Sequence, residues 1–394
     1  MKKTKILFMI NSMNMGGAEK SLSSLLNLLD YERYEVSLQM INRGGDFEKL
    51  LPPQVNILPQ IPYFEFCSQP PAEQIISGKV SFLKIRLQVH SQLKRNARAG
   101  SPLHPTQAFW AGAKNAFDML PGEYDVAIAW GQGTPTHFVA EKVNARKKIA
   151  WVNVNYEAAG HWPAFDEPYY EEYDNIVCVS EKLRSIFVNV FHRYGKKTVT
   201  ILDINNPKMI MSMADQLVSL PGEDGLTLVT VGRLVPQKGY DIAAKAACLL
   251  KKRGIKFCWY VIGGGDSTPI ERDIIQYGIG DCFKLLGAKA NPYPYMKAAD
   301  IYVQTSKFEG YCLTLAEARM LNVPCVTTNF DVVYAQMIDG ENGLVVEMNA
   351  EAVADGIIRL ATDPELYQHI KSYQMQEKKG NTEEIEKFYQ MVES

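Results

Sequence analysis

The sequence predicts an α/β protein made of two doubly wound domains, each built on a parallel sheet. Three observations support this fold class. The chain has 394 residues, a length that suits two domains better than one core. Apolar segments of strand length alternate with helical segments, the pattern that produces parallel sheets. This alternation also starts afresh near the middle of the chain, after Asn205-Asn206-Pro207.

The composition indicates an ordinary folded protein. Hydrophobic residues make up 46% of the chain and charged residues 22%, as in most globular proteins. The net charge of -2 gives no support for extensive nucleic-acid binding. The seven cysteines have irregular spacing without a zinc-binding pattern, so we expect reduced thiols, a cytoplasmic location and no metal site.

The N-terminus has a basic flank and a short apolar run that ends at Ile10. Polar residues follow from Asn11, so the run is expected to be a buried strand rather than a signal peptide. No apolar stretch is long enough to span a bilayer. We therefore expect a soluble protein or one attached peripherally to the cytoplasmic membrane face.

The first half of the chain opens as a βαβ unit, with a loop containing Gly16 and Gly17 between the first strand and the helix. Ser180 is expected to cap a later helix. The predicted strands are 5–10, 35–41, 125–130, 148–154 and 175–179, and the predicted helices are 18–29 and 181–194.

Pro207 restricts Asn206 to extended backbone, which suits a linker to a second domain. The predicted domains are 1–205 and 206–378, followed by a C-terminal helix within 379–394. Ligands of such sheets bind beyond the carboxyl ends of the strands, so we expect a site in a cleft between the domains. The second half is expected to contain strands at 226–231, 256–262, 283–286, 301–305, 324–327 and 343–346, helices at 240–252 and 313–321, and a helical tail from 349.

The segment from Ser306 to Glu317 is the most informative one. Glu309 follows a strand, and the next residues open a helix whose unpaired N–H groups attract an anion. Glu317 lies about two turns into that helix. Each carboxylate can accept hydrogen bonds from hydroxyl groups, and a phosphate fits between them. A sugar, a diphosphate and a ribose offer these groups in that order. Taken alone, however, the two glutamates are better explained as an ordinary loop residue and an ordinary helix residue, because carboxylates are common in such places.

A second segment, Val231 to Gly239, strengthens this interpretation. Arg233 follows a buried strand and Lys238 precedes a helix, so both cations are expected in the same layer of loops as Glu309. A guanidinium and an ammonium group together suit a diphosphate leaving group.

A third segment, Gly16-Gly17, places another helix N-terminus in the first domain, where it can face the phosphates. A glycine pair is a weak signal by itself. The dinucleotide and P-loop glycine patterns are both missing from the sequence, which gives oxidoreduction and ATP hydrolysis little support.

Together the three segments resemble family 4 of the retaining glycosyltransferases, which have the GT-B fold. The resemblance runs through nearly the whole chain and is strongest from Leu226 to Val346. Glu309 and Glu317 fit the family's pair of glutamates separated by seven residues. The resemblance implies that Glu309 contacts the donor sugar, that Glu317 contacts the ribose, and that Arg233 and Lys238 bind the diphosphate.

The same resemblance assigns further donor-binding positions. Gly16 and Gly17 match the family's N-terminal glycine loop, and the stretch from Leu286-Gly287 to Lys297 matches the one beside the nucleobase. A helix near 382–392 looks like the one that crosses back to the first domain. The residues expected to cradle the sugar and phosphate are Gly310, Tyr311, Cys312, Leu313 and Thr314.

The resemblance implies a retaining, metal-independent hexosyltransferase without a cofactor. Its donor would be a nucleotide-sugar, with UDP favoured over GDP. Arg233 and Lys238 would take the place of Mg²⁺ as countercharge to the departing diphosphate. The implied acceptor is a glycan or lipid-linked glycan in bacterial polysaccharide assembly.

One position departs from the family. Asn153 stands where many relatives carry a histidine; it cannot carry a proton, but it can hydrogen-bond the sugar or the acceptor. His161 is either a substitute or an ordinary loop histidine. Asn153 also leaves open a donor-binding subunit that supports a partner transferase. An epimerase or phosphorylase on the same fold has less support, because neither its acid/base set nor a pyridoxal lysine is evident.

The segment from Lys79 to Arg98 has six cations, no acid and interleaved apolar residues. It predicts an amphipathic helix that either rests on anionic lipid headgroups or packs its apolar side on its own domain. The aromatic residues Tyr63, Phe64 and Phe66 either line an acceptor groove or belong to the core.

Overall fold

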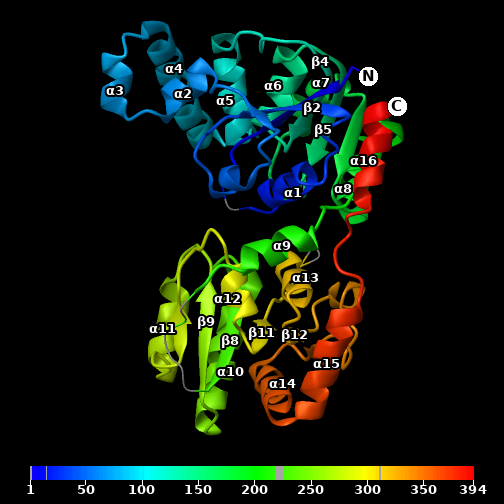
Figure 1. The fold of residues 1–394 in the computed structure, drawn as a ribbon. Coiled ribbons are helices and arrows are strands. Elements are labelled where there is room, and N and C mark those ends of the chain that lie inside the picture. Colours follow the sequence, from blue (N-terminus) through cyan, green and yellow to red (C-terminus); the bar gives the residue numbers. More distant parts are fainter. Residues whose placement is uncertain (1, 15, 101, 219, 221–224, 310–311) are drawn as a thin grey trace. The chain divides into compact units, whose positions relative to one another are not determined.

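The computed structural model describes residues 2–14, 16–100, 102–218, 220, 225–309 and 312–394. They form two compact units, one from residues 1–205 with 381–394 and the other from residues 206–380. Both units are parallel α/β sheets covered by helices (Figure 1). The predicted fold class is therefore confirmed.

Unit 1 contains a parallel sheet with the strand order β3-β2-β1-β4-β5-β6-β7. Five of these strands match the predicted ones, whereas β3 and β7 are too short to produce a periodic pattern in the sequence. The strands are β1 (Thr4–Ile10), β2 (Tyr34–Met40), β3 (Asn56–Ile57), β4 (Tyr124–Trp130), β5 (Ala145–Val152), β6 (Asn175–Cys178) and β7 (Thr198–Thr200).

Several helices of unit 1 begin with proline, whose fixed φ and missing N–H suit the first helical turn. The Ser180 side chain accepts a 3.2 Å hydrogen bond from the Leu183 N–H group, as its predicted capping role requires. The helices are α1 (Gly17–Leu26), α2 (Pro62–Ser68), α3 (Pro71–Ile76), α4 (Val80–Ala99), α5 (Pro105–Ala113), α6 (Thr134–Lys142), α7 (Pro163–Glu171) and α8 (Glu181–Val190).

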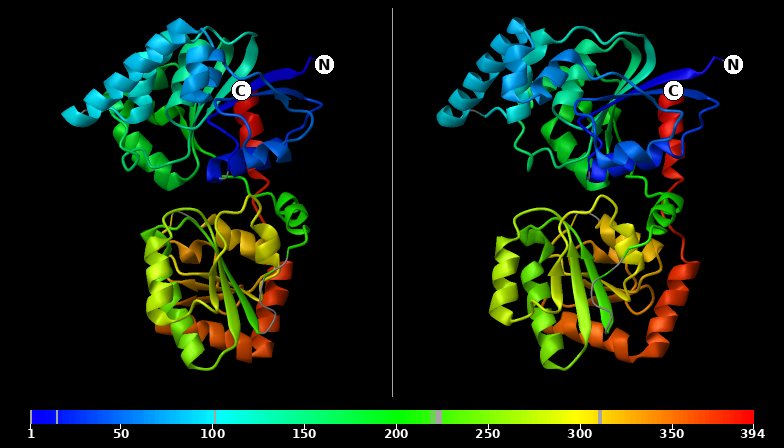
Figure 2. Two further views of the ribbon diagram at one scale, coloured as in Figure 1. Left: turned by 90° about the vertical axis from the view of Figure 1, so that its left-hand side faces the viewer. Right: turned by 60° about the vertical axis from the view of Figure 1, so that its left-hand side comes forward.

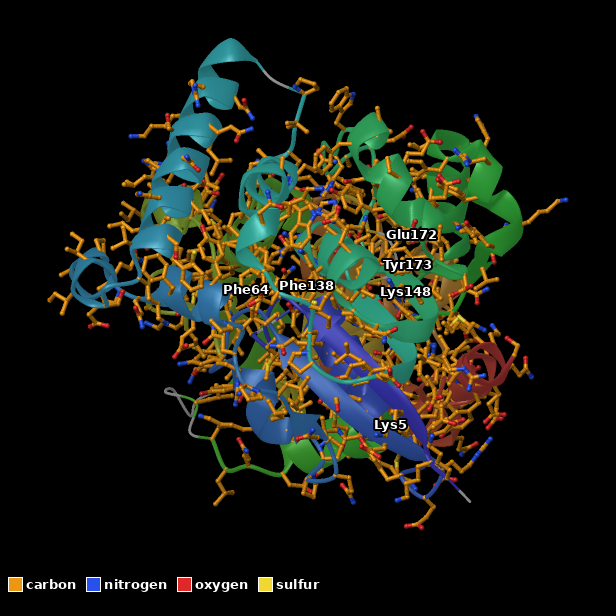
Figure 3. The ribbon with its side chains drawn as sticks, turned by 90° about the horizontal axis from the view of Figure 1, so that it is seen from above. Lys5, Phe64, Phe138, Lys148, Glu172 and Tyr173 are labelled. Carbon is orange, nitrogen blue, oxygen red and sulfur yellow. The ribbon has the colours of Figure 1, made fainter. Side chains whose placement is uncertain are left out.

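The aromatic cluster of α2 belongs to the hydrophobic core of unit 1. Tyr63, Phe64 and Phe66 are all buried, so they do not line an open groove. Figure 3 shows Phe64 beside Phe138 of α6, and their ring centroids are 6.2 Å apart. The expectation that these rings belong to the core is the correct one.

The basic segment forms one helix, α4. Val89 is buried, and Phe82, Leu83 and Leu93 pack against the same core. Arg86 also faces inward, because its guanidinium donates a 2.9 Å hydrogen bond to the Cys67 carbonyl. One side of α4 therefore packs on its own domain, as one of the two expectations stated.

The last helix, α16 (Glu384–Glu393), packs on unit 1 rather than on unit 2. Phe388 is fully buried, with its ring stacked 6.1 Å from that of Phe8. The Tyr389 hydroxyl accepts a 3.1 Å hydrogen bond from the Asp30 N–H group. Both views in Figure 2 show this red helix beside the blue N-terminal elements.

Unit 2 contains a parallel sheet with the order β10-β9-β8-β11-β12-β13. The strands are β8 (Leu226–Val231), β9 (Phe257–Ile262), β10 (Phe283–Leu285), β11 (Ile301–Gln304), β12 (Cys325–Thr328) and β13 (Leu344–Val346). The helices are α9 (Pro207–Ala214), α10 (Tyr240–Lys252), α11 (Thr268–Tyr277), α12 (Tyr293–Lys297), α13 (Leu313–Met320), α14 (Ala350–Thr362) and α15 (Pro364–Gln376).

The joint before unit 2 differs from the predicted extended linker. Asn206 has the expected extended backbone, with φ -94° and ψ 101°. Its side chain, however, accepts hydrogen bonds from the Lys208 and Met209 N–H groups, at 3.1 and 3.3 Å. Asn206 is thus the N-cap of α9 and Pro207 its first residue, so a helix begins where an extended segment was expected.

Within the part of the chain that the structure describes, no helix combines the length and apolarity needed to cross a bilayer. All seven cysteines are free thiols.

Replacing Phe388 by alanine should destabilise unit 1 by about 3–5 kcal/mol, because it removes a fully buried ring from a packed core. Hydrogen–deuterium exchange should show faster exchange in β1 and β4, with unit 2 as internal reference. Glu386→Ala, on an exposed position of the same helix, is the matched control. Equal protection in both variants would show that α16 does not support unit 1.

Candidate functional site

The strand order of unit 2 identifies where a ligand is expected. The chain moves from β8 outward to β9 and β10, and then returns to pair β11 with the other side of β8. Right-handed connections therefore place α10 and α12 on opposite faces of the sheet. The loops that follow β8 and β11 flank the point of reversal, where open α/β sheets bind their ligands.

Lys238 and Glu309 come from these two loops and form an ion pair. The Lys238 Nζ atom lies 2.6 Å from Glu309 Oε1, and only 13% and 7% of the two side chains are exposed. Gln237 donates a 2.9 Å hydrogen bond to the Phe308 carbonyl beside Glu309. The structure thus brings together one predicted cation and one predicted carboxylate at the carboxyl edge of the sheet.

A buried polar chain behind Glu309 fixes its carboxylate. The Ser306 hydroxyl donates a 2.6 Å hydrogen bond to Glu309 Oε1 and accepts a 2.7 Å bond from the Gln304 amide. Gln304 in turn accepts a 2.7 Å bond from the Tyr302 hydroxyl. Among the described residues, Glu309 Oε1 therefore has two donors, Lys238 and Ser306, whereas Oε2 has only a 3.4 Å contact with Gln237.

Our sequence analysis did not assign a role to Tyr302 or Gln304. They alternate with apolar residues along a strand, so they share one face of the sheet with Ser306. All three side chains are fully buried. A run of polar residues on one face of an otherwise apolar buried strand is the signal that would have identified them.

Glycines allow the loops of the site to pack backbone against backbone. Gly239 has φ +66°, and a Cβ atom there would lie 1.9 Å from the Thr305 carbonyl oxygen. A Cβ atom at Gly263 would lie 1.8 Å from the Gly232 oxygen. The Thr305 hydroxyl also donates a 3.0 Å bond to the Lys238 carbonyl. These contacts hold Lys238 opposite Glu309.

Arg233 occupies a different environment from Lys238. It is exposed just after β8, and its guanidinium has no hydrogen-bond or ion-pair partner among the described residues. Of the two cations expected to bind the diphosphate, Lys238 is therefore in an ion pair and Arg233 is open to solvent.

Helix α13 follows Glu309, and Cys312 is its N-cap. Cys312 adopts the left-handed conformation with φ 69°, which is unusual for a residue with a side chain. Burial, together with the charge of Glu309, raises the pKa of its thiol to about 12, so it stays protonated at neutral pH. The next helical residues, Leu313 and Thr314, are partly buried.

Three more of the predicted donor-binding residues lie along this segment. Glu317 is buried within α13. Gly310 and Tyr311 lie outside the described residues.

A cavity of about 380 Å³ opens beside the loop of Arg233. Its lining includes the apolar side chains of Leu234 and Leu285, the polar side chains of Ser267 and Glu271, and the backbone of Gly263–Gly265 and Gly287. Gly287 has φ +69°, a conformation that glycine adopts without strain. The predicted stretch beside the nucleobase thus begins on this cavity, whereas Lys297 at its other end pairs with Asp215 at 2.7 Å.

In unit 1, Gly16 is the N-cap of α1 and Gly17 its first residue. A Cβ atom at Gly16 would lie 2.2 Å from a Glu19 carboxylate oxygen. Burial raises the pKa of Glu19. A carboxylate therefore lies against the glycine loop, and a phosphate that approached the N-terminus of α1 would require Glu19 to turn away.

Asn153 directly follows β5, at the carboxyl edge of the sheet of unit 1. Its backbone N–H group donates a 3.0 Å hydrogen bond to Gln132, from the loop after β4. Its own side-chain oxygen and nitrogen are both buried and have no hydrogen-bond partner within the described residues. An unpaired buried amide costs about 1–3 kcal/mol, and a ligand hydroxyl that paired with it would recover part of this cost.

His161 belongs to a buried network rather than to an open loop surface. Its Nδ1 atom lies 3.2 Å from Asp166 Oδ2, which also accepts a 2.6 Å bond from the Tyr156 hydroxyl. The His137 Nε2 atom lies 2.8 Å from the other carboxylate oxygen. Burial raises the pKa of Asp166, but the hydrogen bonds from His137 and His161 outweigh it and keep the pKa below its ordinary value.

Across the described residues, no group of histidine, cysteine, aspartate and glutamate side chains has a geometry that could hold a metal ion.

Comparison with known proteins agrees with this architecture. Residues 215–377, most of unit 2, match the family model described as Glycosyl transferases group 1. An uncharacterized glycosyltransferase of Haemophilus influenzae is 27% identical over 220 residues, 55% of this chain and 60% of the relative. The amylovoran biosynthesis glycosyltransferase AmsK of Erwinia amylovora is 28% identical over 176 residues, 42% of each chain.

Among solved structures, Anabaena Alr3699/HepE in complex with UDP and glucose superposes with a TM-score of 0.63, at 15% identity and 99% coverage of both chains. This likeness shows the GT-B fold. The family match and the relatives' names support a glycosyltransferase of group 1. The chain spans only 60% and 42% of the lengths of the two curated relatives.

Replacing Lys238 by alanine should destabilise unit 2 by roughly 2 kcal/mol, between the values for surface and buried ion pairs. The loss arises because a nearly buried Glu309 carboxylate remains without its cation. Glu309→Gln in the same background should restore part of the stability. Urea unfolding of the four proteins of this double-mutant cycle measures the coupling, and additive effects would contradict a stabilising ion pair.

Cys312→Gly should change the free energy of unfolding by about 1 kcal/mol or less, because relief of left-handed strain offsets the loss of a small buried side chain. Cys312→Val should cost more than about 2 kcal/mol, since a β-branched residue is poorly tolerated at positive φ. Melting temperatures of the two variants test this order, and the opposite order would refute it.

Proposed function

We propose that the protein is a retaining, metal-independent glycosyltransferase that transfers a hexose from a nucleotide-sugar, with UDP as the favoured nucleotide. The acceptor is a glycan or a lipid-linked glycan. The observation that carries the proposal is the Lys238–Glu309 pair at the reversal point of the sheet of unit 2. It places an anion-binding group and a hydroxyl-binding group side by side where ligands of this fold bind.

The donor diphosphate is assigned to the cations of the loop after β8. An ammonium group has three N–H donors, so Lys238 can keep its bond to Glu309 while it binds a phosphate oxygen. Arg233 is exposed beside the cavity, and its fork suits a second phosphate. Together they supply the positive charge that a departing nucleoside diphosphate requires in the transition state.

The nucleotide is assigned to the cavity of about 380 Å³. The glycines and leucines of its lining suit a flat ring, and it lies beside the loop that carries Arg233. Glu317 on α13 is assigned to the ribose hydroxyls. The solved relative Alr3699/HepE, whose complex contains UDP and glucose, supports UDP as the first nucleotide to test.

Glu309 is assigned to the hydroxyl groups of the donor sugar rather than to covalent attack. Two donors already hold its Oε1 atom, and each lowers the electron density that a nucleophile needs. The Oε2 atom, with its longer 3.4 Å contact, is the better acceptor for a sugar hydroxyl.

The acceptor is assigned to unit 1, where Asn153 carries an unpaired buried amide. This side chain can bind a hydroxyl but cannot remove its proton. His161 is held within the Asp166 network, so we give it a structural role. The name of the relative from amylovoran biosynthesis supports a biosynthetic role for the transfer.

Arg233→Ala should abolish most of the thermal stabilisation that UDP provides while leaving the melting temperature of the free protein unchanged. The reason is that Arg233 is exposed and carries no described contact that the fold would lose. A thermal-shift titration with UDP, GDP and their common sugars measures this, since a ligand stabilises in proportion to its binding of the native state. Lys256→Ala is the control, because it removes an exposed cation that directly precedes β9, at the opposite edge of the sheet from Arg233.

If UDP raised the melting temperature of the wild type, and raised those of Arg233→Ala and Lys256→Ala by equal amounts, the assignment of Arg233 would be refuted. No shift with any nucleotide would refute the donor site itself and favour a subunit that depends on a partner. Donor binding without transfer to any acceptor would favour the donor-binding subunit.

Glu309→Ala should lower the rate of sugar transfer or donor hydrolysis by at least about 100-fold, because the contact with the sugar hydroxyl is lost in the transition state. The variant should still bind UDP. Addition of EDTA should leave the wild-type rate unchanged, as cations of the protein carry the countercharge. A strict Mg²⁺ requirement, or full activity of Glu309→Ala, would contradict the mechanism.

A further inference from the structure

Unit 1 exposes a set of large apolar side chains at one end. Ile75 and Ile76 on α3 are 68% and 82% exposed, and Val80 and Leu87 on α4 are each 60% exposed. Val80 and Leu87 are seven residues apart, so they share one face of the helix. Figure 1 shows α3 at the outer end of unit 1, away from the sheet. Clustered apolar side chains of this size are unusual on a surface that meets only water.

The same face carries positive charge. Lys84 and Lys94 follow the helical spacing of Val80 and Leu87, and Lys79 and Arg95 lie beside them. All four cations are exposed, and none has an ion-pair partner among the residues that the structure describes. We call these eight residues the α3–α4 patch: Ile75, Ile76, Lys79, Val80, Lys84, Leu87, Lys94 and Arg95.

The charge of this region differs from that of the chain as a whole. Residues 71–99 contain six cations and one carboxylate, a net charge of +5, whereas the whole chain carries -2. A local positive field on a slightly acidic protein attracts an anionic partner to this end of unit 1.

We propose that the α3–α4 patch binds the surface of a membrane that contains anionic lipid. Apolar side chains at the end of a helical hairpin can enter the headgroup region, while lysines beside them contact the phosphates and keep their stems along the apolar boundary. Each basic residue near such a surface strengthens binding, and the apolar residues add affinity that salt does not screen. This inference does not depend on the proposed transferase activity.

A second copy of the chain fits the patch less well. A symmetric contact would place the same patch on both copies, so lysines would face lysines. Like charges in such a contact oppose association. An anionic lipid surface offers the complementary charge without this conflict.

The opposite face of α4 already has its partners. Val89 is buried, Phe82 and Leu93 pack on the core, and Arg86 donates to the Cys67 carbonyl. The patch is therefore presented by a helix fixed to the domain, and substitutions on its outer face remove no core contact. This separation makes the proposal testable without unfolding the protein.

The experiment is sedimentation of the full chain with vesicles of phosphatidylcholine alone or mixed with phosphatidylglycerol. Wild-type protein should bind only the mixed vesicles. A triple variant that combines Lys84→Gln, Lys94→Gln and Arg95→Gln should bind about 100-fold more weakly, since each cation contributes roughly a fivefold factor. Ile75→Ser with Ile76→Ser should weaken binding by about tenfold or more, and the remaining affinity should fall further at high salt.

Two matched controls keep the result specific to the patch. Ile275 on α11 of unit 2 is 80% exposed, so Ile275→Ser removes an equally exposed apolar residue elsewhere. Lys182→Gln removes an exposed cation from α8 of unit 1. Both control variants should bind the mixed vesicles like the wild type.

Three results would overturn the proposal. The first is a wild-type protein that does not bind mixed vesicles. The second is equal binding by the patch variants and the controls. The third is a dimer in solution, detected by analytical ultracentrifugation, that the patch variants convert to monomer, because the patch would then be occupied by a second copy.

Discussion

The candidate site of unit 2 depends on close contact between the backbones of neighbouring loops. Gly263 lies against the Gly232 carbonyl and Gly239 against that of Thr305, at distances that leave no room for a Cβ atom. The contact of Gly239 with Thr305 draws the loop after β8 toward the loop after β11 and brings Lys238 to Glu309, whereas the contact of Gly263 with Gly232 joins the loops after β9 and β8. The geometry of the ion pair therefore depends on two glycines, Gly239 and Gly263, which have no side chain.

Each unit contains a buried carboxylate that is stabilised by donors from neighbouring side chains. Asp166 of unit 1 accepts hydrogen bonds from Tyr156 and lies within bonding distance of two histidines. Glu309 of unit 2 is held by a lysine and a serine. The difference lies in what remains available. Asp166 is saturated by its neighbours, which suits a structural role. Within the part of the chain that the structure describes, one oxygen of Glu309 has only a long contact, which suits ligand binding.

Much of the fold could be predicted from the sequence, because long buried strands and amphipathic helices leave periodic patterns. The helix Tyr240–Lys252 was predicted with its observed ends, since glycine stands just before its start and soon after its end. Short elements such as β3 and β7 left no pattern, and α9 was missed because Asn206-Pro207 suggested a linker. Lys238 and Glu309 were predicted from their loops, but the chain from Tyr302 through Gln304 to Ser306 depends on which face of β11 turns toward the site. The sequence likewise does not reveal that Lys238 forms an ion pair while Arg233 is exposed, because this difference depends on three-dimensional packing.

The return of α16 to unit 1 has a consequence for biosynthesis. The segment that supplies Phe388 to the core beside Phe8 is synthesised after the whole of unit 2, because residues 206–380 of that unit are contiguous and precede it. Domains of nascent chains commonly fold in the order of their synthesis. Unit 1 begins to emerge before unit 2 but is completed after it, so an apolar surface on Phe8 and Trp151 stays uncovered until α16 has been synthesised. A nascent chain that stalls just before α16 would carry a complete unit 2 and an incomplete unit 1, and this apolar surface would then be available to a chaperone.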